Sequence, residues 1–210
     1  MRSAGDATRR VLLATRSAGK LHELKPIIVA AGFDPITLID AGIPEIPAEA
    51  ELEHEPTFEE NALSKALYFH GVSGLPTVAD DSGIEVAALG GAPGVRSKRW
   101  SGREDLVGHA LDDANNALLL RMLERSPDRR AKYVCAAAYS GRGWELVERG
   151  EVQGAITRAP RGTNGFGYDP YFESAELGRT FGEVAMEEKA RVSHRARAFA
   201  KLLRRMQSLG

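Results

Sequence analysis

The sequence of 210 residues contains one cysteine, Cys135, and five histidines that are scattered along the chain. One cysteine excludes a disulfide within the chain and a metal site built from several thiolates. Scattered histidines argue against a histidine-rich zinc site. The cysteine content therefore predicts a protein of a reducing compartment, and we expect a cytoplasmic one.

Long apolar runs are also missing. The longest stretch without Asp, Glu, Lys or Arg covers residues 66–79, and His70 and Pro76 interrupt it. A membrane-spanning helix needs about 18 consecutive apolar residues. The first ten residues carry three arginines, and no apolar segment typical of a secretory leader follows them. We therefore expect no association with a membrane.

Neither sign of charge is in excess, because 28 Lys and Arg face 29 Asp and Glu for a net charge of -1. Proteins that coat duplex nucleic acid carry a large basic excess, so we expect no nucleic-acid partner. Hydrophobic residues make up 43% and charged residues 27%, as in ordinary globular chains. The composition predicts a single domain over residues 1–210, with residues 1–10 as a flexible N-terminal extension.

Charge is nevertheless distributed unevenly along the chain. Residues 40–60 contain eight acidic residues and no Lys or Arg, whereas residues 187–205 contain seven Lys or Arg and two acidic residues. One interpretation is a solvated acidic loop and a solvated basic helix. The other is a metal-binding part and an anion-binding part of one site for a metal-chelated polyphosphate. Charge alone does not separate the two.

Hydrophobic periodicity predicts strands that alternate with helices. The expected strands cover residues 11–14, 36–39 and 77–79, a hairpin covers 133–156, and the expected helices cover 58–69, 105–125 and the chain from 193 onward. A further helix begins near Leu21, and Pro26 must lie in its first turn or kink it. Thr57 and Glu60 form a capping-box pattern. This order predicts an α/β fold on a mixed sheet.

Two common nucleotide-binding motifs fail on inspection. A Walker A loop that ends at Gly19 and Lys20 needs Gly at position 14 and Ser or Thr at position 21, where the chain has Ala14 and Leu21. A dinucleotide fingerprint that starts at Gly165 has Pro170 where its third glycine belongs. Neither motif supports a function.

Polar clusters remain at the ends of the predicted elements. Asp80-Asp81-Ser82-Gly83 places two carboxylates and a hydroxyl where the third predicted strand ends. Adjacent carboxylates repel each other unless a cation offsets their charge, and Mg²⁺ is common in phosphate chemistry. The alternative is a turn that ends the strand. Lys20, at the start of a helix, either binds a phosphate or is an ordinary surface lysine.

Two later segments could contact a nucleobase. Residues 160–170 form a glycine-rich loop with two aromatic residues, which suits close backbone approach and ring stacking, or simply connects two elements. His194 and Arg195 place two hydrogen-bond donors side by side at the start of the last helix. Two donors would read a purine with a 6-keto group, or they form an exposed helix start.

Together and in this order, these segments resemble the inosine/xanthosine triphosphate pyrophosphatase family, over residues 13–203. The most specific stretches are residues 79–83, Leu89-Gly90-Gly91-Ala92-Pro93-Gly94-Val95, residues 165–170, and Glu188-Lys189 followed by Ser193-His194-Arg195. The resemblance implies an elongated mixed β-sheet flanked by helices, with two lobes and an active site in the cleft between them. It also implies a homodimer.

The same resemblance implies an activity and a set of site residues. The activity is Mg²⁺-dependent hydrolysis of ITP, dITP and XTP to the nucleoside monophosphate and pyrophosphate. Glu53 and Asp81 would hold Mg²⁺, and Asp81 would also be the catalytic base for the attacking water. The triphosphate would bind Thr15, Arg16, Ser17, Ala18, Gly19, Lys20 and Lys65. The other substrate contacts would be Ser82, Phe166, Gly167, Tyr168, Asp169, Lys189, His194 and Arg195, the last two at the base edge.

Glu60 competes with Glu53 for the metal, but its place in the capping box already engages its carboxylate, so Glu53 is favoured. Ser17 stands where the family usually has Asn, and Pro56 could alter how Glu53 is presented. Two other functions remain open: a related pyrophosphatase with a different base preference, and a nucleotide- or RNA-binding protein without catalysis.

Overall fold

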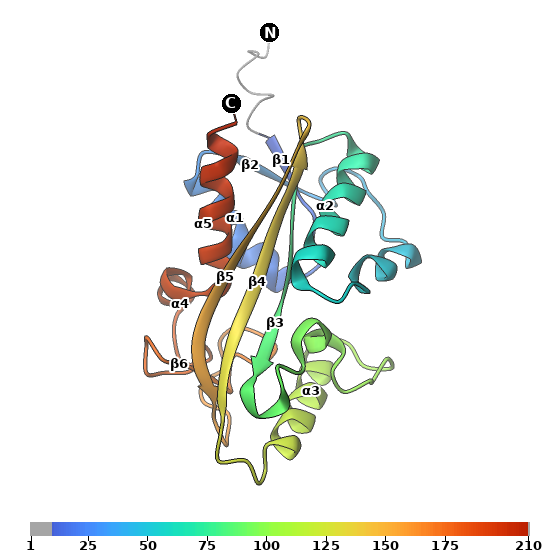
Figure 1. The fold of residues 1–210 in the computed structure, drawn as a ribbon. Helices are drawn as coiled ribbons and strands as arrows, with labels where there is room; N and C mark the ends of the chain where they lie inside the picture. The colour runs from blue at the N-terminus through green and yellow to red at the C-terminus, as the bar shows by residue number, and fades with distance from the viewer. Residues whose placement is uncertain (1–9, 210) are drawn as a thin grey trace. The chain divides into compact units, whose positions relative to one another are not determined.

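A computed structural model describes residues 10–209 of the chain (Figure 1). The strands are β1 (Arg10–Leu13), β2 (Asp34–Thr37), β3 (Thr77–Val86), β4 (Arg130–Gly141), β5 (Trp144–Ile156) and β6 (Phe172–Ser174). The α-helices are α1 (Ala18–Ala30), α2 (Phe58–Ser73), α3 (Gly108–Met122), α4 (Met186–Val192) and α5 (His194–Gln207). Short 3₁₀ helices cover η1 (Pro47–Glu53), η2 (Ala87–Leu89) and η3 (Gly94–Arg99).

The strands form one six-stranded sheet in the order β2-β1-β3-β4-β5-β6. β1 pairs in parallel with β2 and β3, and β5 pairs antiparallel with β6, so the sheet is mixed as predicted. β4 and β5 form a hairpin whose turn residues, Arg142 and Gly143, both have positive φ. Such two-residue turns match the right-handed twist of the strands that they connect.

The described residues divide into two compact units. The first, called unit 1, comprises residues 10–81, 135–150 and 195–209, and the second, called unit 2, comprises residues 82–134 and 151–194. Each unit is therefore assembled from segments that are distant in sequence. The boundary separates Asp81 from Ser82 and His194 from Arg195. The prediction of a single domain stays a prediction.

Each unit has its own apolar core. In unit 1, Leu24 and Ile28 of α1 and Phe199 and Leu202 of α5 pack with Val78 of β3. These helices cover one face of the sheet in unit 1, and α2 lies on the opposite face (Figure 1). The core of unit 2 gathers around aromatic residues and the strands β3 to β6, and its largest members are Tyr133, Tyr168, Phe172 and Phe181.

The start of α2 confirms the predicted capping box. The Thr57 hydroxyl accepts a hydrogen bond from the Glu60 amide at 3.2 Å and donates one to the Glu60 carboxylate at 2.6 Å. In α1, Pro26 lies well inside the helix, which excludes the first of the two alternatives, a place in the first turn, and leaves the second, a kink at Pro26, as a prediction. The first helix begins earlier than expected because the Ser17 side chain caps it.

Two strand predictions also need correction. The strand predicted for residues 36–39 covers Asp34–Thr37, because the Asp40 carboxylate accepts hydrogen bonds from the Thr37 amide and hydroxyl and closes a turn there. The third strand does not end at Asp80 but continues to Val86. The expected N-terminal extension lies outside the described residues except for Arg10, which begins β1.

Within residues 10–209, no helix combines the length and apolar character needed to cross a bilayer.

Candidate functional site

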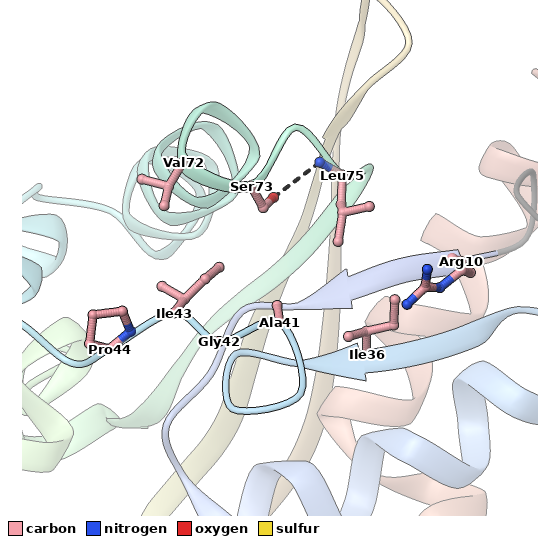
Figure 2. Close-up of a pocket in the computed structure, with 9 residues that line it drawn as sticks. All are labelled: Arg10, Ile36, Ala41, Gly42, Ile43, Pro44, Val72, Ser73 and Leu75. Carbon is pink, nitrogen blue, oxygen red and sulfur yellow. Dashed lines mark hydrogen bonds between the residues drawn. The ribbon is translucent and has the colours of Figure 1, made fainter.

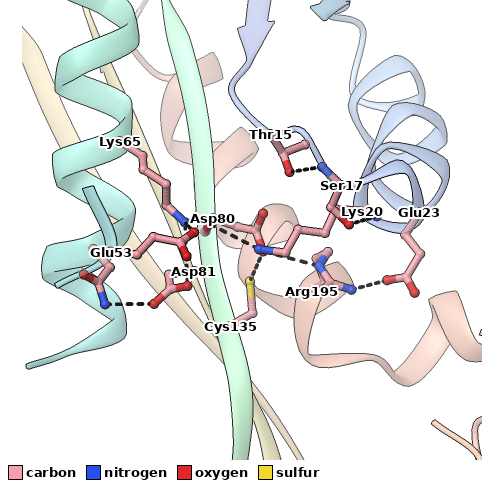
Figure 3. Close-up of polar contacts among 11 residues, drawn as sticks. Thr15, Ser17, Lys20, Glu23, Glu53, Lys65, Asp80, Asp81, Cys135 and Arg195 are labelled. Atoms are coloured by element: carbon pink, nitrogen blue, oxygen red, sulfur yellow. Dashed lines mark hydrogen bonds and ion pairs between the residues drawn. The ribbon is translucent and has the colours of Figure 1, made fainter. Parts of the chain in front are cut away.

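Asp80 and Asp81 lie on opposite faces of β3, because side chains alternate along a strand (Figure 3). Asp80 faces α1 and α5, where it pairs with Lys20 and Arg195. Asp81 faces α2, where it approaches Lys65. Cationic side chains thus offset the charge of this pair, and the binding of Mg²⁺ at Asp81 stays a prediction. Each carboxylate has its own cationic partners.

The Asp80 side belongs to a buried network of charges. The Asp80 carboxylate lies 3.0 Å from the Lys20 ammonium and 3.4 Å from Arg195 Nε, and its side chain is fully buried. Arg195 also pairs with Glu23 of α1. Burial alone would raise the pKa of Asp80, but Lys20, Arg195 and Lys65 together hold it well below its usual range. This network thus stabilises the ionised form of Asp80.

The Asp81 side is less strongly neutralised. The Lys65 ammonium lies 3.6 Å from Asp81 Oδ1 and donates a hydrogen bond to Glu53 Oε1 at 2.8 Å. Burial raises the pKa of Asp81, and Lys65 and Lys20 offset this effect only in part. Burial lowers the pKa of Lys65, but Asp81, Glu53 and Asp80 outweigh it and raise the value. Asp81 therefore combines a buried position with a raised proton affinity, as expected of a general base.

Asn61 of α2 is a residue of this site that the sequence reasoning missed. Its amide donates a hydrogen bond to Asp81 Oδ2 at 3.0 Å, and its side chain also bonds both backbone groups of Glu55. Asn61 thus holds the Asp81 carboxylate and the backbone of Glu55, the residue before Pro56, in fixed positions. The available sequence signal was a polar residue next to Ala62 and three positions after Phe58, beside the apolar positions of the predicted helix.

The start of α1 forms the predicted phosphate-binding segment, residues 15–20. Ser17 accepts a hydrogen bond from the Lys20 amide at 3.4 Å, and its own amide bonds Thr15 Oγ1 at 3.2 Å (Figure 3). The first-turn amides of a helix have no carbonyl partners within it and favour anions. Ala18 is exposed and Gly19 is half-buried, so this segment is accessible. The Ser17 hydroxyl accepts the cap bond and keeps its proton for another acceptor.

Arg16 belongs to the same segment, but its side chain turns toward the acidic stretch. Its guanidinium forms two hydrogen bonds with the Glu49 carboxylate, at 2.7 and 3.0 Å. It also bonds the carbonyls of Ile43 and Pro44. Glu49 lies in η1, and Glu53 is the last residue of η1. Arg16 therefore anchors the segment that carries Glu53, and its predicted contact with phosphate stays a prediction.

The same segment distinguishes the two candidate metal ligands. Glu53 shares Lys65 with Asp81, whereas Glu60 is exposed and its carboxylate accepts the Thr57 hydroxyl. Within residues 10–209, no group of three or more His, Cys, Asp or Glu side chains is arranged to hold a metal ion. Mg²⁺ commonly binds through one or two carboxylates together with substrate phosphates. Glu53 and Asp81 supply two carboxylates that both lie near the Lys65 ammonium, and this pair fits that mode of Mg²⁺ binding.

Unit 2 holds the other predicted substrate residues, and Asp169 connects several of them. Asp169 Oδ2 accepts hydrogen bonds from the Lys189 ammonium at 2.5 Å and the Phe166 amide at 2.9 Å. Asp169 Oδ1 accepts one from the Tyr133 hydroxyl at 3.2 Å. Gly165 has positive φ, and a Cβ there would collide with the Asp169 carboxylate, so only glycine fits. Asp169 thus orients its neighbours from a buried position.

The loop around Gly167 is held by α3. The Gly167 amide donates to Asp112 Oδ2 at 3.0 Å, and Asn116 Nδ2 donates to the Gly167 carbonyl at 2.9 Å. Asp112 and Asn116 are one helical turn apart, so one accepts from the amide and the other donates to the carbonyl of the same glycine. The Tyr168 hydroxyl donates to the Ser97 carbonyl at 2.8 Å. Specific hydrogen bonds to α3 and to Ser97 therefore fix the conformation of the glycine-rich segment.

The pair of donors at the start of α5 is buried. The His194 imidazole stacks on Tyr133, and Arg195 is engaged by Glu23 and Asp80. Neither residue forms an exposed helix start, so that interpretation is wrong. Ser82, next to Asp81 on β3, is half-buried. A direct contact of these three residues with a base stays a prediction.

Comparison with known proteins shows the family to which the chain belongs. The family model described as the Ham1 family matches residues 11–205. The chain belongs to the Ham1 family. A dITP/XTP pyrophosphatase of Symbiobacterium thermophilum is 46% identical over 205 residues, 96% of each chain. One of Mycobacterium tuberculosis strain H37Rv is 47% identical over 206 residues, 95% of this chain and 96% of the relative.

Solved Ham1 structures agree with the fold. The Staphylococcus aureus Ham1 protein superposes with a TM-score of 0.81 at 35% identity, covering 96% of this chain and 100% of that one. A nucleoside-triphosphatase / dITP/XTP pyrophosphatase from Mycobacterium abscessus has a TM-score of 0.69 at 43% identity, covering 92% and 97%. Membership of the Ham1 family confirms the resemblance inferred from the motifs.

This Ham1 chain also has a cavity whose lining includes Ile43 and Pro44, the two residues whose carbonyls bond Arg16 (Figure 2). The cavity has a volume of about 420 Å³ and is lined by Ile36 of β2, the segment 41–44, the end of α2 and Arg10. Ser73 Oγ accepts a hydrogen bond from the Leu75 amide at its rim. None of these described lining residues is a predicted site residue, so the cavity does not enter the proposed chemistry.

Proposed function

We propose that this Ham1 chain hydrolyses the deaminated purine nucleotides dITP, ITP and XTP to the nucleoside monophosphate and pyrophosphate, with Mg²⁺ as cofactor. The names of its relatives supply the substrate class. The separation of Asp80 from Asp81 carries the chemical argument. Both carboxylates are buried, but the pKa of Asp80 is lowered by its cationic partners and the pKa of Asp81 is raised. Pairs of carboxylates with opposite shifts commonly divide the structural and the acid–base roles.

In this proposal Asp81 is the catalytic base. Its Oδ2 is held by Asn61, which leaves Oδ1, on the side of Lys65, to accept a proton from the attacking water. Glu53 and Asp81 would hold Mg²⁺, which when bound neutralises phosphate charge and polarises a phosphoryl oxygen. Lys65 lies between these two carboxylates, so its ammonium is positioned to pair with a phosphate that arrives there.

The remaining residues would bind the nucleotide. The first turn of α1 and Lys20 would receive the triphosphate. In unit 2, the half-buried Phe166 ring, with the Lys189 ammonium 5.4 Å from its centroid, offers a surface for stacking a base. Ser82, Gly167, Tyr168, Asp169, His194 and Arg195 complete the proposed substrate site. We further propose, on the family resemblance, a cytoplasmic homodimer.

Product analysis tests this function. The protein is incubated with ITP, XTP, GTP and ATP, with Mg²⁺ and with EDTA. Monophosphate and pyrophosphate from ITP and XTP, little product from ATP, and none with EDTA is the expected result. Diphosphate and phosphate would place the cleavage at the other anhydride. Nucleotide binding without any product would favour the non-catalytic alternative.

A further inference from the structure

Two predicted substrate residues of unit 2, His194 and Asp169, meet at one side chain that the family motifs do not include. Tyr133 of β4 is 7% exposed and belongs to the apolar core of unit 2. We propose that Tyr133 is a positioning residue for base selectivity, which fixes the plane of the His194 imidazole and the orientation of the Asp169 carboxylate at once. This inference rests on the proposed function.

The first contact is a ring stack. The centroids of the Tyr133 and His194 rings are 4.6 Å apart, and their planes differ by 6°. The N–H and lone pair of an imidazole lie in the plane of its ring, and hydrogen bonds weaken steeply when they are misaligned. The stack therefore sets the direction in which His194 can donate to a base edge.

The second contact is the hydrogen bond from the Tyr133 hydroxyl to Asp169 Oδ1 at 3.2 Å. The other oxygen of this carboxylate holds the Lys189 ammonium and the Phe166 amide. A buried carboxylate needs each of its donors, because burial without hydrogen bonds is costly. Removal of the Tyr133 hydroxyl would free Asp169 to rotate, and Lys189 and Phe166 would follow it.

Core packing alone does not account for this residue. Tyr133 also contacts Phe172 at 4.6 Å between centroids and lies nearly parallel to Phe181 at 5.9 Å. Phenylalanine at position 133 would fill the same apolar space as Tyr133. Only the phenol combines that packing with a donor that reaches Asp169. The hydroxyl is thus the part of Tyr133 that links the core of unit 2 to the predicted base site.

Steady-state kinetics with ITP, which has a 6-keto group, and ATP, which has a 6-amino group, test the proposal on three variants. Tyr133→Phe removes the hydroxyl and keeps the stack, whereas Tyr133→Leu removes both. Tyr171→Phe, at a half-buried tyrosine packed on the same core, is the matched control. The ratio of kcat/KM for ITP to that for ATP should fall about three- to tenfold in Tyr133→Phe, the size of one lost hydrogen bond. It should fall further in Tyr133→Leu and stay unchanged in Tyr171→Phe.

A second readout does not depend on turnover. The NMR signals of the His194 ring, assigned with His194→Gln, should carry a ring-current shift in the wild type and in Tyr133→Phe. They should lose it in Tyr133→Leu. An active wild type with unchanged selectivity in Tyr133→Phe would overturn the inference alone, even if that variant melts earlier. A wild type that turns over no nucleotide would overturn the proposed function and this inference together.

Discussion

Asp80 and Asp81 are neighbours in sequence, but their carboxylates face opposite sides of β3 and meet different lysines (Figure 3). The positive charges of Lys20 and Arg195 outweigh the effect of burial and lower the pKa of Asp80 far below its usual value. Asp81 is left with a raised pKa because burial outweighs the attraction of Lys65 and Lys20. A dipeptide of identical residues thus supplies one structural charge and one candidate base.

The pH dependence of kcat/KM should report Asp81. A base acts in its deprotonated form, so activity should fall as the pH drops through the pKa of Asp81. That pKa is raised above the ordinary Asp value of 3.8. We expect an acid limb at a higher pH than an unperturbed carboxylate would give, measured with ITP at a Mg²⁺ concentration low enough to leave the free enzyme without metal, because a bound Mg²⁺ would lower the pKa of a carboxylate that holds it. A limb at or below the ordinary value would contradict this role.

Lys65→Gln should move that limb further. The Lys65 cation lowers the pKa of Asp81, so its removal raises the value, and activity should be lost at a higher pH than in the wild type. KM should also rise if Lys65 pairs with phosphate. Lys25→Gln, at an exposed position of α1, is the control and should leave the limb in place. A shift of the limb to lower pH in Lys65→Gln would reject the electrostatic argument.

Arg195 should matter for both stability and selectivity. Its side chain is 3% exposed and pairs with both Glu23 and Asp80, so Arg195→Ala removes an ion-pair partner from each of these carboxylates. Loss of one member of a buried charge network costs about 3–5 kcal/mol of unfolding free energy. Denaturant titration should show this loss, and Arg204→Ala on the exposed side of α5 should not. A preference for ITP over ATP that persists in Arg195→Lys would remove Arg195 from the base site.

The contact between Arg16 and Glu49 should influence the metal requirement. Arg16→Lys cannot reproduce the two parallel hydrogen bonds to Glu49, so η1 and Glu53 should be held less firmly. We expect a loss of about 1 kcal/mol in stability and a higher Mg²⁺ concentration for half-maximal rate. Glu49→Gln should give a similar effect, and the double variant less than the sum. Arg103→Lys, in an exposed pair with Asp105, should behave as the wild type in both measurements.

Much of the fold was predictable because its local signals are strong. The capping box at Thr57 starts α2, and the apolar run before residue 15 forms β1. β3 was predicted too short because a pair of aspartates reads as the end of a strand. The pair is tolerated inside a strand because lysines from two different helices neutralise it, and such contacts are not visible in the sequence.

The site was predicted less completely for the same reason. The family resemblance assigned Lys20, Lys65 and Asp81 to the site, and the structure brings both lysines to the aspartates of β3. Asn61 and Tyr133 were missed, because a buried amide and a core tyrosine look like packing until their partners are known. Arg16 was assigned to phosphate by its place in the loop, and only the folded chain shows that Glu49 engages it.

The most direct test of the account compares the wild type with Asp81→Asn, using ITP in the presence of Mg²⁺. Product formation and nucleotide binding are measured on the same samples, and Glu151→Gln controls for the loss of a half-buried carboxylate away from the predicted site residues. The account predicts that the wild type releases the monophosphate and pyrophosphate, and that Asp81→Asn binds ITP but releases almost none. Turnover by Asp81→Asn close to that of the wild type would contradict the assignment of Asp81 as the base.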